Sequence, residues 1–166
     1  MAIRYRCTTC KKMHTGLPDL GFESPHQYEG LSKTERKKLA KLSHDLSEIE
    51  DDRFIRAVLE VPIVGTDESF GWGVWVSLSQ RNFARYVELF HEDPPGGEGP
   101  YFGWLCNQVP SYPDTLNLKT QVHLRSAKQR PRIELEPTDH PLAVHQRDGI
   151  ALDDLLSRIG DRLHAE

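Results

Sequence analysis

The sequence predicts an α+β domain with a mainly antiparallel sheet, about three amphipathic helices and an N-terminal CxxC knuckle. Three observations lead to this fold class. Strand-like runs occur in local pairs, three stretches carry apolar residues at helical spacing, and two cysteines two residues apart lie near the start of the chain. A chain of 166 residues, 37% of them hydrophobic, is long enough to bury one core. We therefore expect a single domain over residues 1–166, with the knuckle and a loop in 1–30 and the α+β body in 31–166.

The first fifty residues are expected to hold one short strand, a long loop and one helix. Residues 3–7 have strand composition and run into a tight turn, whereas the glycines and prolines of 13–30 indicate a loop. A helix begins at Ser32, because Ser32 and Glu35 have the spacing of a capping box. Apolar residues then recur at intervals of three and four, which predicts one buried stripe on a single helix: Leu39, Leu42, Leu46 and Ile49.

The middle of the chain predicts a hairpin followed by a helix. Residues 54–63 and 70–78 both have strand composition, and the turn-like residues between them favour antiparallel pairing. Ser79 is suited to cap the next helix. The apolar positions of that helix fall at i, i+3, i+4 and i+7: Phe83, Tyr86, Val87 and Phe90.

The last third of the chain predicts three strands, a loop and a closing helix. Residues 101–106 form an aromatic strand, and 116–124 alternate between two sets of positions, which is the clearest strand pattern in the sequence. A second alternating run, 132–136, is expected to pair with it in antiparallel fashion. The proline-containing stretch 137–149 is expected to be a loop. The spacing of leucine and isoleucine in 152–163 predicts an amphipathic helix.

The composition argues against several classes of protein. No run approaches the roughly 18 to 20 uninterrupted apolar residues of a membrane span, so we expect no membrane contact. The start of the chain lacks the apolar segment of a secretory signal, and its three cysteines do not suit a disulfide framework. These features predict a cytoplasmic protein.

Basic residues are concentrated in the first quarter of the chain. Residues 1–41 hold nine Lys and Arg against four acidic residues, whereas the remainder holds twelve against twenty-one, and the net charge is −4. A basic segment of this kind can attach to the phosphates of nucleic acid, but it is also typical of one solvated helix face. We favour the second interpretation and expect nucleic-acid binding through residues 33–41 to be weak and salt-dependent at most.

Cys7, Cys10 and His14 form the strongest local motif. Two thiolates separated by two residues on a tight turn can hold one metal ion, and a nearby imidazole is a further ligand that Zn²⁺ accepts. A closed structural zinc site needs four ligands, so the fourth is water or one of three residues that the sequence does not rank: His26, His44 and Cys106. Two alternatives are unmetallated structural thiols and redox chemistry, although the Gly and Pro that follow His14 disfavour a redox site.

An acidic residue and three histidines suggest an alternative, enzymatic function. Asp139 lies beside His140 in a predicted loop, with His145 five residues later and His123 on a predicted strand. Such residues could serve as a general base or form a second metal site in a hydrolytic or metal-assisted enzyme. No nucleophile motif and no phosphate-binding glycine loop accompanies them, and Asp139 is equally suited to a local turn. We favour the turn.

Aromatic residues gather in two of the predicted strands. Trp72 and Trp75 have opposite parity in one strand, so they cannot both face the same core. We predict that Trp75 faces outward beside Tyr101 and Trp104, and that these three residues form a contact surface for a protein partner or for a second copy of the chain. The alternative is that all of them belong to the core.

Six strings of the sequence are specific enough to compare with known families. They are CTTCKKMHTGLP (7–18), FIR (54–56), GWGVWVSL (71–78), PYFGWLCN (100–107), PDTLNLKT (113–120) and PTDHPL (137–142). Together they resemble a bacterial family catalogued as domain of unknown function 2199. The resemblance covers nearly the whole chain. It implies a single-domain bacterial protein, and it brings no known activity.

The chain departs from the pattern of that family at two positions. A glycine often follows the second cysteine, where this chain has Lys11, and a cysteine often occupies the position of Ser47. If that cysteine were a fourth metal ligand in the family, the site here would be weaker or limited to three ligands, since a hydroxyl is a poor zinc ligand. We expect a binding protein whose N-terminal turn is a structural zinc or thiol knuckle.

Overall fold

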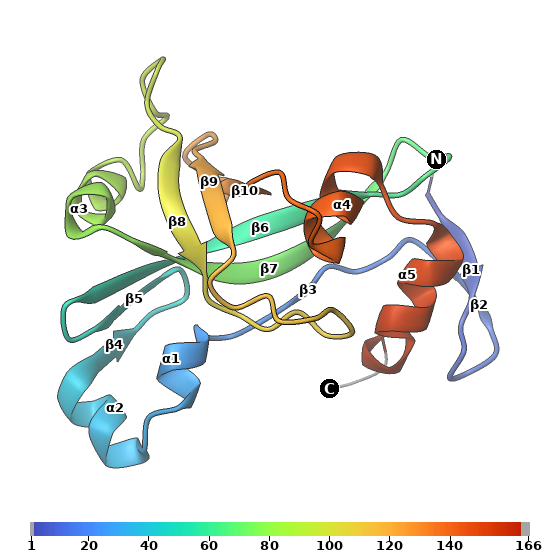
Figure 1. Ribbon diagram of the computed structural model, residues 1–166, viewed down its shortest axis with the longest axis horizontal. Helices are drawn as coiled ribbons and strands as arrows, with labels where there is room; N and C mark the ends of the chain where they lie inside the picture. Colours follow the sequence, from blue (N-terminus) through green and yellow to red (C-terminus); the bar gives the residue numbers. More distant parts are fainter. Residues whose placement is uncertain (1, 164–166) are drawn as a thin grey trace.

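Two long antiparallel strands form the centre of the fold. The computed structural model describes residues 2–163, and in it β6 (Asp52–Pro62) and β7 (Ser69–Leu78) pair along nearly their whole length (Figure 1). The predicted hairpin is confirmed. Both strands are long because both faces are covered over part of their length, so that apolar side chains of either parity are buried.

Three more strands extend this pair and close it into a barrel. β8 (Tyr101–Leu105) pairs with β7, β9 (Lys119–His123) with β8, and β10 (Arg132–Leu135) with β9, each in antiparallel orientation. β10 then pairs with β6. That closing pair is parallel because the fifth strand of a simple up-and-down succession runs in the same direction as the first.

The closed sheet refines the predicted fold class. An α+β domain is present, but the expected mainly antiparallel sheet included neither the closure nor any parallel pair. A second parallel pair joins β3 (Leu20–Gly21) to β7, where Gly21 lies opposite Gly73. A side-chain carbon added to Gly21 would lie 3.1 Å from the Gly73 carbonyl oxygen. The two backbones approach closely because glycine occupies both positions.

The interior of the barrel is filled mainly by buried apolar side chains. The predicted alternation of 116–124 is confirmed in β9, where Thr120 and Val122 point inward and Lys119 points outward. The inward residues of the five strands pack in one cluster, whose most buried members include Ile55, Ala57, Leu59, Val74, Val76, Leu105, Val122 and Ile133.

The long helix predicted after Ser32 is wrong in its second half. The capping box is present, since Glu35 N–H donates to the Ser32 side chain and the Glu35 carboxylate accepts from the Ser32 N–H. The helix α2 ends at Leu39 (Lys33–Leu39), and the chain continues as a hairpin of β4 (Ala40–Leu42) and β5 (Leu46–Ile49).

The hairpin forms because β5 adds to the free edge of β6. Leu46 pairs with Ile55 and Ile49 with Asp52, which gives β5 a tertiary partner that a helix would not have. Ser47 and Ile49 are buried in β5, whereas Leu42 is 38% exposed, so the apolar spacing that indicated a helix is not one buried stripe. Pairing with β6 therefore overrode the local helical pattern.

Two short helices occupy segments predicted as loops. α1 (His26–Glu29) lies within the expected loop 13–30, together with β2 (Met13–Thr15) and β3. α4 (Pro141–Asp148) lies within the expected loop 137–149. Pro141 stands in the first turn of α4, where its missing N–H costs nothing, and Nδ1 of His140 accepts from the Leu142 N–H as an unusual cap.

The other two predicted helices are confirmed. α3 (Gln80–Glu88) follows Ser79, whose side chain accepts from the Asn82 N–H. α5 (Leu152–Ile159) buries Leu155 and Ile159 and runs into a short 3₁₀ turn, η1 (Gly160–Arg162). Within residues 2–163, no helix has the length and apolar character needed to cross a membrane.

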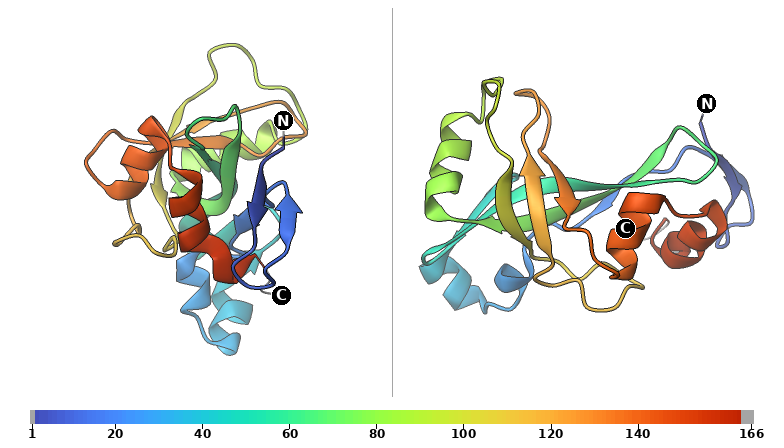
Figure 2. Two further views of the ribbon diagram at one scale, coloured as in Figure 1. Left: turned by 90° about the vertical axis from the view of Figure 1, so that its right-hand side faces the viewer. Right: turned by 45° about the horizontal axis from the view of Figure 1, so that its top comes forward.

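The remaining elements stand at two ends of the molecule. β1 (Arg4–Arg6) and β2 (Met13–Thr15) form a separate antiparallel hairpin beside α5 (Figure 1). The elements α1, α2, β4 and β5 lie at the opposite end of the long β6–β7 pair, as the second view in Figure 2 also shows. Residues at these two ends are therefore separated by the length of the central strands.

Candidate metal centre

The β1–β2 hairpin positions the CxxC motif. Cys7 directly follows β1, and His14 stands in β2 opposite Tyr5. The connecting turn is closed by two backbone bonds, Cys7 N–H to the Lys12 oxygen (2.8 Å) and Lys11 N–H to the Cys7 oxygen (3.0 Å). The strand predicted over 3–7 and the tight turn after it are confirmed, whereas β2 was expected to be loop.

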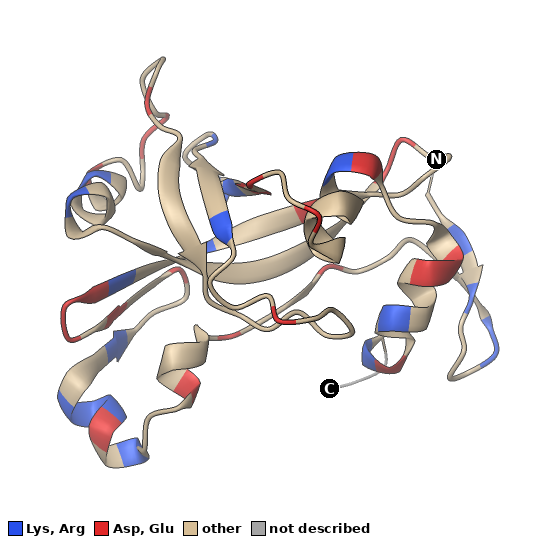
Figure 3. Cartoon of the chain, in the orientation of Figure 1, with Lys and Arg blue, Asp and Glu red and all other residues tan. Residues whose placement is uncertain are grey.

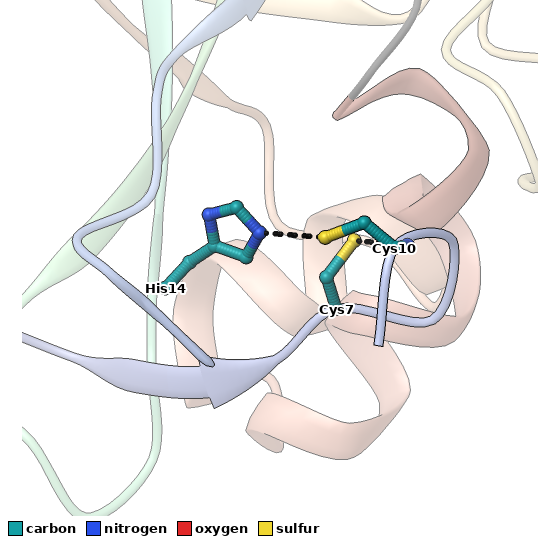
Figure 4. A group of neighbouring side chains, drawn as sticks. All are labelled: Cys7, Cys10 and His14. Atoms are coloured by element: carbon teal, nitrogen blue, oxygen red, sulfur yellow. Dashed lines mark hydrogen bonds between the residues drawn. The ribbon is translucent and has the colours of Figure 1, made fainter. Parts of the chain in front are cut away.

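Three ligand-type atoms converge beneath this turn. The donor atoms of Cys7, Cys10 and His14 all lie within 4.8 Å of one another, and Nε2 of His14 is 3.1 Å from the Cys10 sulfur. Figure 4 shows the three side chains turned toward a common point. Backbone N–H groups of Thr9 and Cys10 donate to the Cys7 sulfur at 3.4 and 3.5 Å. Such bonds favour the thiolate, which is the form that binds metal.

The cluster has apolar and aromatic neighbours. Cys7 is 1% exposed, while Cys10 and His14 are half-buried. The Tyr5 ring stacks on the imidazole of His14 with ring centroids 5.6 Å apart. Burial, and then the nearby thiols of Cys7 and Cys10, raise the pKa of Tyr5, so its hydroxyl stays protonated beside the cluster.

The C-terminal turn η1 packs against the CxxC turn. Gly160 is buried, and a side-chain carbon added to it would lie 2.6 Å from the Thr8 hydroxyl. Cys7 shares its apolar cluster with Leu155 and Ile159 of α5. The knuckle is therefore packed against the last helix rather than projecting into solvent.

The residues considered as a fourth ligand lie elsewhere. Within residues 2–163, the group of metal-ligand atoms around Cys7 contains only the three residues of the motif. His26 begins α1, His44 lies in the β4–β5 turn, and Cys106 follows β8. None of the three belongs to the cluster.

Cys106 is a buried structural thiol. It is 1% exposed, and burial raises its pKa to about 11. Its sulfur donates to the Trp104 oxygen (3.3 Å) and lies 3.6 Å from Nε2 of Gln27, which donates to it. A thiol in this state is a poor nucleophile and a poor metal ligand.

The residues proposed for catalysis have separate surroundings. Nε2 of His140 faces the Pro113 and Asp114 carbonyl oxygens at 3.2 and 3.0 Å, so this histidine fixes a loop as well as capping α4. Asp139 is exposed. His123 lies on β9, and its buried Nε2 has no hydrogen-bond partner among the described residues. No hydrogen bond or ion pair within residues 2–163 joins these residues to one another.

His145 belongs to a polar cluster that sequence reasoning missed. Its Nδ1 is 2.7 Å from the Tyr112 hydroxyl, and its Nε2 is 3.6 Å from an Asp154 carboxylate oxygen. Arg158 pairs with Asp154 at 2.9 Å and stacks over the Tyr112 ring at 4.3 Å. The i,i+4 spacing of Asp154 and Arg158 could have predicted their ion pair from the sequence. The contact of Tyr112 with His145 could not be predicted in this way, because Tyr112 lies in a loop that is distant in the sequence.

The prediction that Trp75 faces outward is wrong. Trp75 is fully buried, and its indole N–H donates to the Phe22 oxygen at 3.0 Å. The outer face of β7 is covered here by the segment around α1, which forms a second small core with Trp75, Phe54 and Cys106. Trp72 and Trp75 do lie in different clusters, as their opposite parity required.

One exposed aromatic pair remains on β8. Tyr101 is 6% exposed and its hydroxyl donates to Glu98, so it does not form a surface. Trp104 is 41% exposed and Phe102 39% exposed, with an edge-to-face contact of 5.0 Å between ring centroids. The pair lines a cavity of about 410 Å³ together with Asp51 and Asp52. The shared parity of Phe102 and Trp104 could have revealed the pair.

The basic residues of the first quarter do not form a continuous stripe. Lys33, Arg36, Lys37 and Lys38 lie on α2, where Glu35 stands among them, while Arg4 and Arg6 lie on β1 at the other end of the molecule (Figure 3). Arg36 folds back over the Tyr28 ring at 4.6 Å. This arrangement is that of a solvated helix face.

One known protein family matches most of the chain. The model of a family described as "Uncharacterized protein conserved in bacteria (DUF2199)" matches residues 6–150. The chain belongs to this family. All three residues of the metal cluster lie inside the part that matches DUF2199, whereas α5 and η1 follow it. No curated protein and no solved structure matches the chain significantly.

The two departures from the DUF2199 pattern now have a structural interpretation. Lys11 adopts a left-handed conformation with φ 63°, which glycine accepts without strain. Ser47 is buried on β5, at the opposite end of the molecule from the knuckle, and its hydroxyl donates to the Lys41 oxygen (Figure 1). A cysteine at this position would not reach Cys7, so the hypothesis that it supplies a fourth ligand is wrong for this fold.

Proposed function

We propose that this member of DUF2199 is a non-catalytic binding protein whose N-terminal knuckle holds one structural zinc ion. The observation that carries the zinc assignment is the convergence of two sulfur atoms and one imidazole nitrogen within 4.8 Å. Thiolate and imidazole are the ligands that structural zinc sites use, and hard cations such as Mg²⁺ prefer oxygen.

The size of the hairpin supports a structural role for the metal. β1 and β2 have three residues each, and an isolated two-stranded hairpin is marginally stable at best. A zinc ion held by Cys7, Cys10 and His14 would link the turn to β2. Because the ligands are scattered in the unfolded chain, binding of the metal contributes to folding.

Elemental analysis of protein purified without chelator tests the zinc assignment. We expect close to one zinc ion per chain in the wild type and loss of that zinc in the double variant Cys7→Ser, Cys10→Ser. The matched control is Cys106→Ser, which removes a thiol outside the cluster and should keep its zinc. A double variant with unchanged zinc content would contradict the assignment, because it lacks both thiolates.

The exposed aromatic pair supports the binding function. Phe102 and Trp104 present large apolar side chains to solvent from a rigid strand of the barrel. Aromatic residues at well-ordered positions contribute much of the binding energy in protein interfaces. We therefore assign the contact surface to Phe102 and Trp104 in place of Trp75 and Tyr101, with a protein as the partner.

Site-specific photo-crosslinking in cells tests this surface. A photoreactive residue at position 102 should give one discrete adduct that contains a partner protein or a second copy of the chain. The control position is Val87, which is 44% exposed on α3 but not part of the aromatic pair. Light scattering of the purified protein distinguishes the second copy from another partner. Equal, diffuse adducts from both positions would contradict the surface.

A further inference from the structure

The exposed aromatic pair on β8 borders a cavity that is also acidic. Phe102 and Trp104 share this cavity, of about 410 Å³, with Asp51 and Asp52, which lie where the chain turns from β5 into β6. Polar residues at the start of α3 line it as well. Its volume falls within the range of ligand pockets, roughly 300 to 1,000 Å³. The cavity is therefore large enough to hold a side chain of a partner protein.

The two aspartates give the cavity a negative charge that its own arginine does not neutralise. Both aspartates are exposed, and no ion pair among residues 2–163 involves either of them. Arg53 also lines the cavity, but its Nε pairs with Glu48 at 3.2 Å and its Nη1 donates to the Glu50 and Asp52 carbonyl oxygens. Lys119 stands on β9, beyond β8, and does not line the cavity. The charge of this surface therefore complements a cation.

The walls of the cavity are held in place by hydrogen bonds. Nε2 of Gln80 donates to the Asp51 carbonyl oxygen at 3.1 Å and thereby joins the turn before β6 to the first turn of α3. The aromatic pair stands on β8, which is paired with β7 on one side and with β9 on the other. An ordered site loses less conformational entropy on binding, which favours a specific contact.

The same chain shows which cation suits an aromatic ring beside a carboxylate. Arg158 stacks over the Tyr112 ring at 4.3 Å and pairs with Asp154 at 2.9 Å, so one guanidinium satisfies both groups. The guanidinium is planar, and its N–H groups match the two oxygens of a carboxylate, whereas the ammonium of lysine has no such plane. Tryptophan is the aromatic side chain that attracts cations most strongly.

We infer that the cavity binds an arginine side chain of the partner protein, with the guanidinium against Trp104 and paired with Asp51 and Asp52. This inference rests on the proposed function, which assigns the contact surface to Phe102 and Trp104. The partner segment is therefore basic as well as able to cover two aromatic rings. Added salt weakens the contact, because the aspartates are exposed and their attraction for the cation is screened.

An NMR titration of the isotope-labelled protein tests the inference. The probe is the peptide acetyl-Gly-Arg-Gly-amide, and norleucine replaces arginine in the control peptide. The arginine peptide should shift the indole N–H signal of Trp104 in a saturable way, and Trp104→Phe identifies that signal by removing it. The indole of Trp75 is buried and bonded to the Phe22 oxygen, so its signal should not respond. In Asp51→Asn, Asp52→Asn the dissociation constant should rise at least about fivefold.

The matched control is the double variant Asp139→Asn, Asp153→Asn. It removes two exposed acidic charges that do not line the cavity, and it should bind the arginine peptide as the wild type does. Equal affinity for the norleucine peptide would overturn the inference, as would unchanged affinity in Asp51→Asn, Asp52→Asn. A lysine peptide that binds as tightly as the arginine peptide would overturn the choice of arginine.

Photo-crosslinking at position 102 separates this inference from the proposed function. In the background of Asp51→Asn, Asp52→Asn, the discrete adduct expected from this position should fall at least about fivefold. An adduct that forms in equal amount in that background overturns the role of the aspartates and leaves the contact surface in place. If no discrete adduct forms in the wild-type background, the contact surface is overturned together with the inference.

Discussion

The Tyr112 hydroxyl and Nδ1 of His145 lie 2.7 Å apart and connect a loop to the helical end of the molecule. Nε2 of His145 faces the Asp154 carboxylate, so the proton of the neutral imidazole belongs on Nε2 and Nδ1 accepts from the tyrosine. Burial raises the pKa of Tyr112 to about 12, which keeps this donor protonated at every ordinary pH. The native structure therefore favours the neutral form of His145.

This preference predicts a pH dependence of stability. Burial, followed by the charge of Arg158, lowers the pKa of His145 below its ordinary value of 6.5, although Asp154 partly opposes the shift. The unfolded chain then takes up more protons than the native chain as the pH falls through 6.5, so stability decreases toward acid. Denaturant unfolding of wild type and His145→Gln, at equal zinc content, should give a steeper acid decline for the wild type. Parallel declines would refute the prediction.

Lys11→Gly should stabilise the protein. A side chain at a left-handed position costs roughly 1 kcal/mol, and glycine removes that cost. Part of this gain is offset because glycine increases the conformational entropy of the unfolded chain. We expect the free energy of unfolding to rise by up to about 1 kcal/mol in denaturant titrations. Lys11→Ala is the control, because it removes the bond from Lys11 Nζ to the Thr8 oxygen but keeps the strain. A glycine variant no more stable than the alanine variant would contradict this explanation.

Two tryptophan variants should differ sharply in stability. Trp75→Ala empties a fully buried site and removes the bond to the Phe22 oxygen, so we expect a loss of about 3 to 5 kcal/mol. Trp104→Ala acts on a side chain that is 41% exposed, and we expect a loss below about 1 kcal/mol. Urea titrations of both variants measure these losses. Similar losses would mean that Trp104 is also part of the core and not a contact surface.

Nucleic-acid binding should stay weak. The basic residues of α2 stand beside Glu35 and the net charge of the chain is −4, so few phosphates can be neutralised at one site. Fluorescence anisotropy with labelled single-stranded RNA and duplex DNA should give only weak, steeply salt-dependent binding. Sub-micromolar affinity at about 0.15 M salt that disappears in Lys37→Glu, Lys38→Glu would overturn this prediction.

The elements that the sequence predicted well share one property. Ser32 with Glu35, Ser79 with α3, and the alternation of β9 each depend on interactions within a few residues, and the structure contains all three. The cysteine and histidine spacing belongs to the same class, because Cys7, Cys10 and His14 all lie within one short hairpin of β1 and β2. Local hydrogen bonds and local side-chain spacing can be predicted directly from the sequence.

Other features depended on contacts between distant segments. The hairpin of β4 and β5 replaced a predicted helix because β6 offered a strand edge. Trp75 was buried because α1, some fifty residues earlier in the chain, covers the outer face of β7. The sequence by itself determined the α+β class, the capped helices and the metal-ligand motif. Tertiary structure alone decided the closure of the barrel, the exposure of Phe102 and Trp104, and the packing of η1 against Thr8. Each of these features is stabilised by contacts between segments that are far apart in the chain.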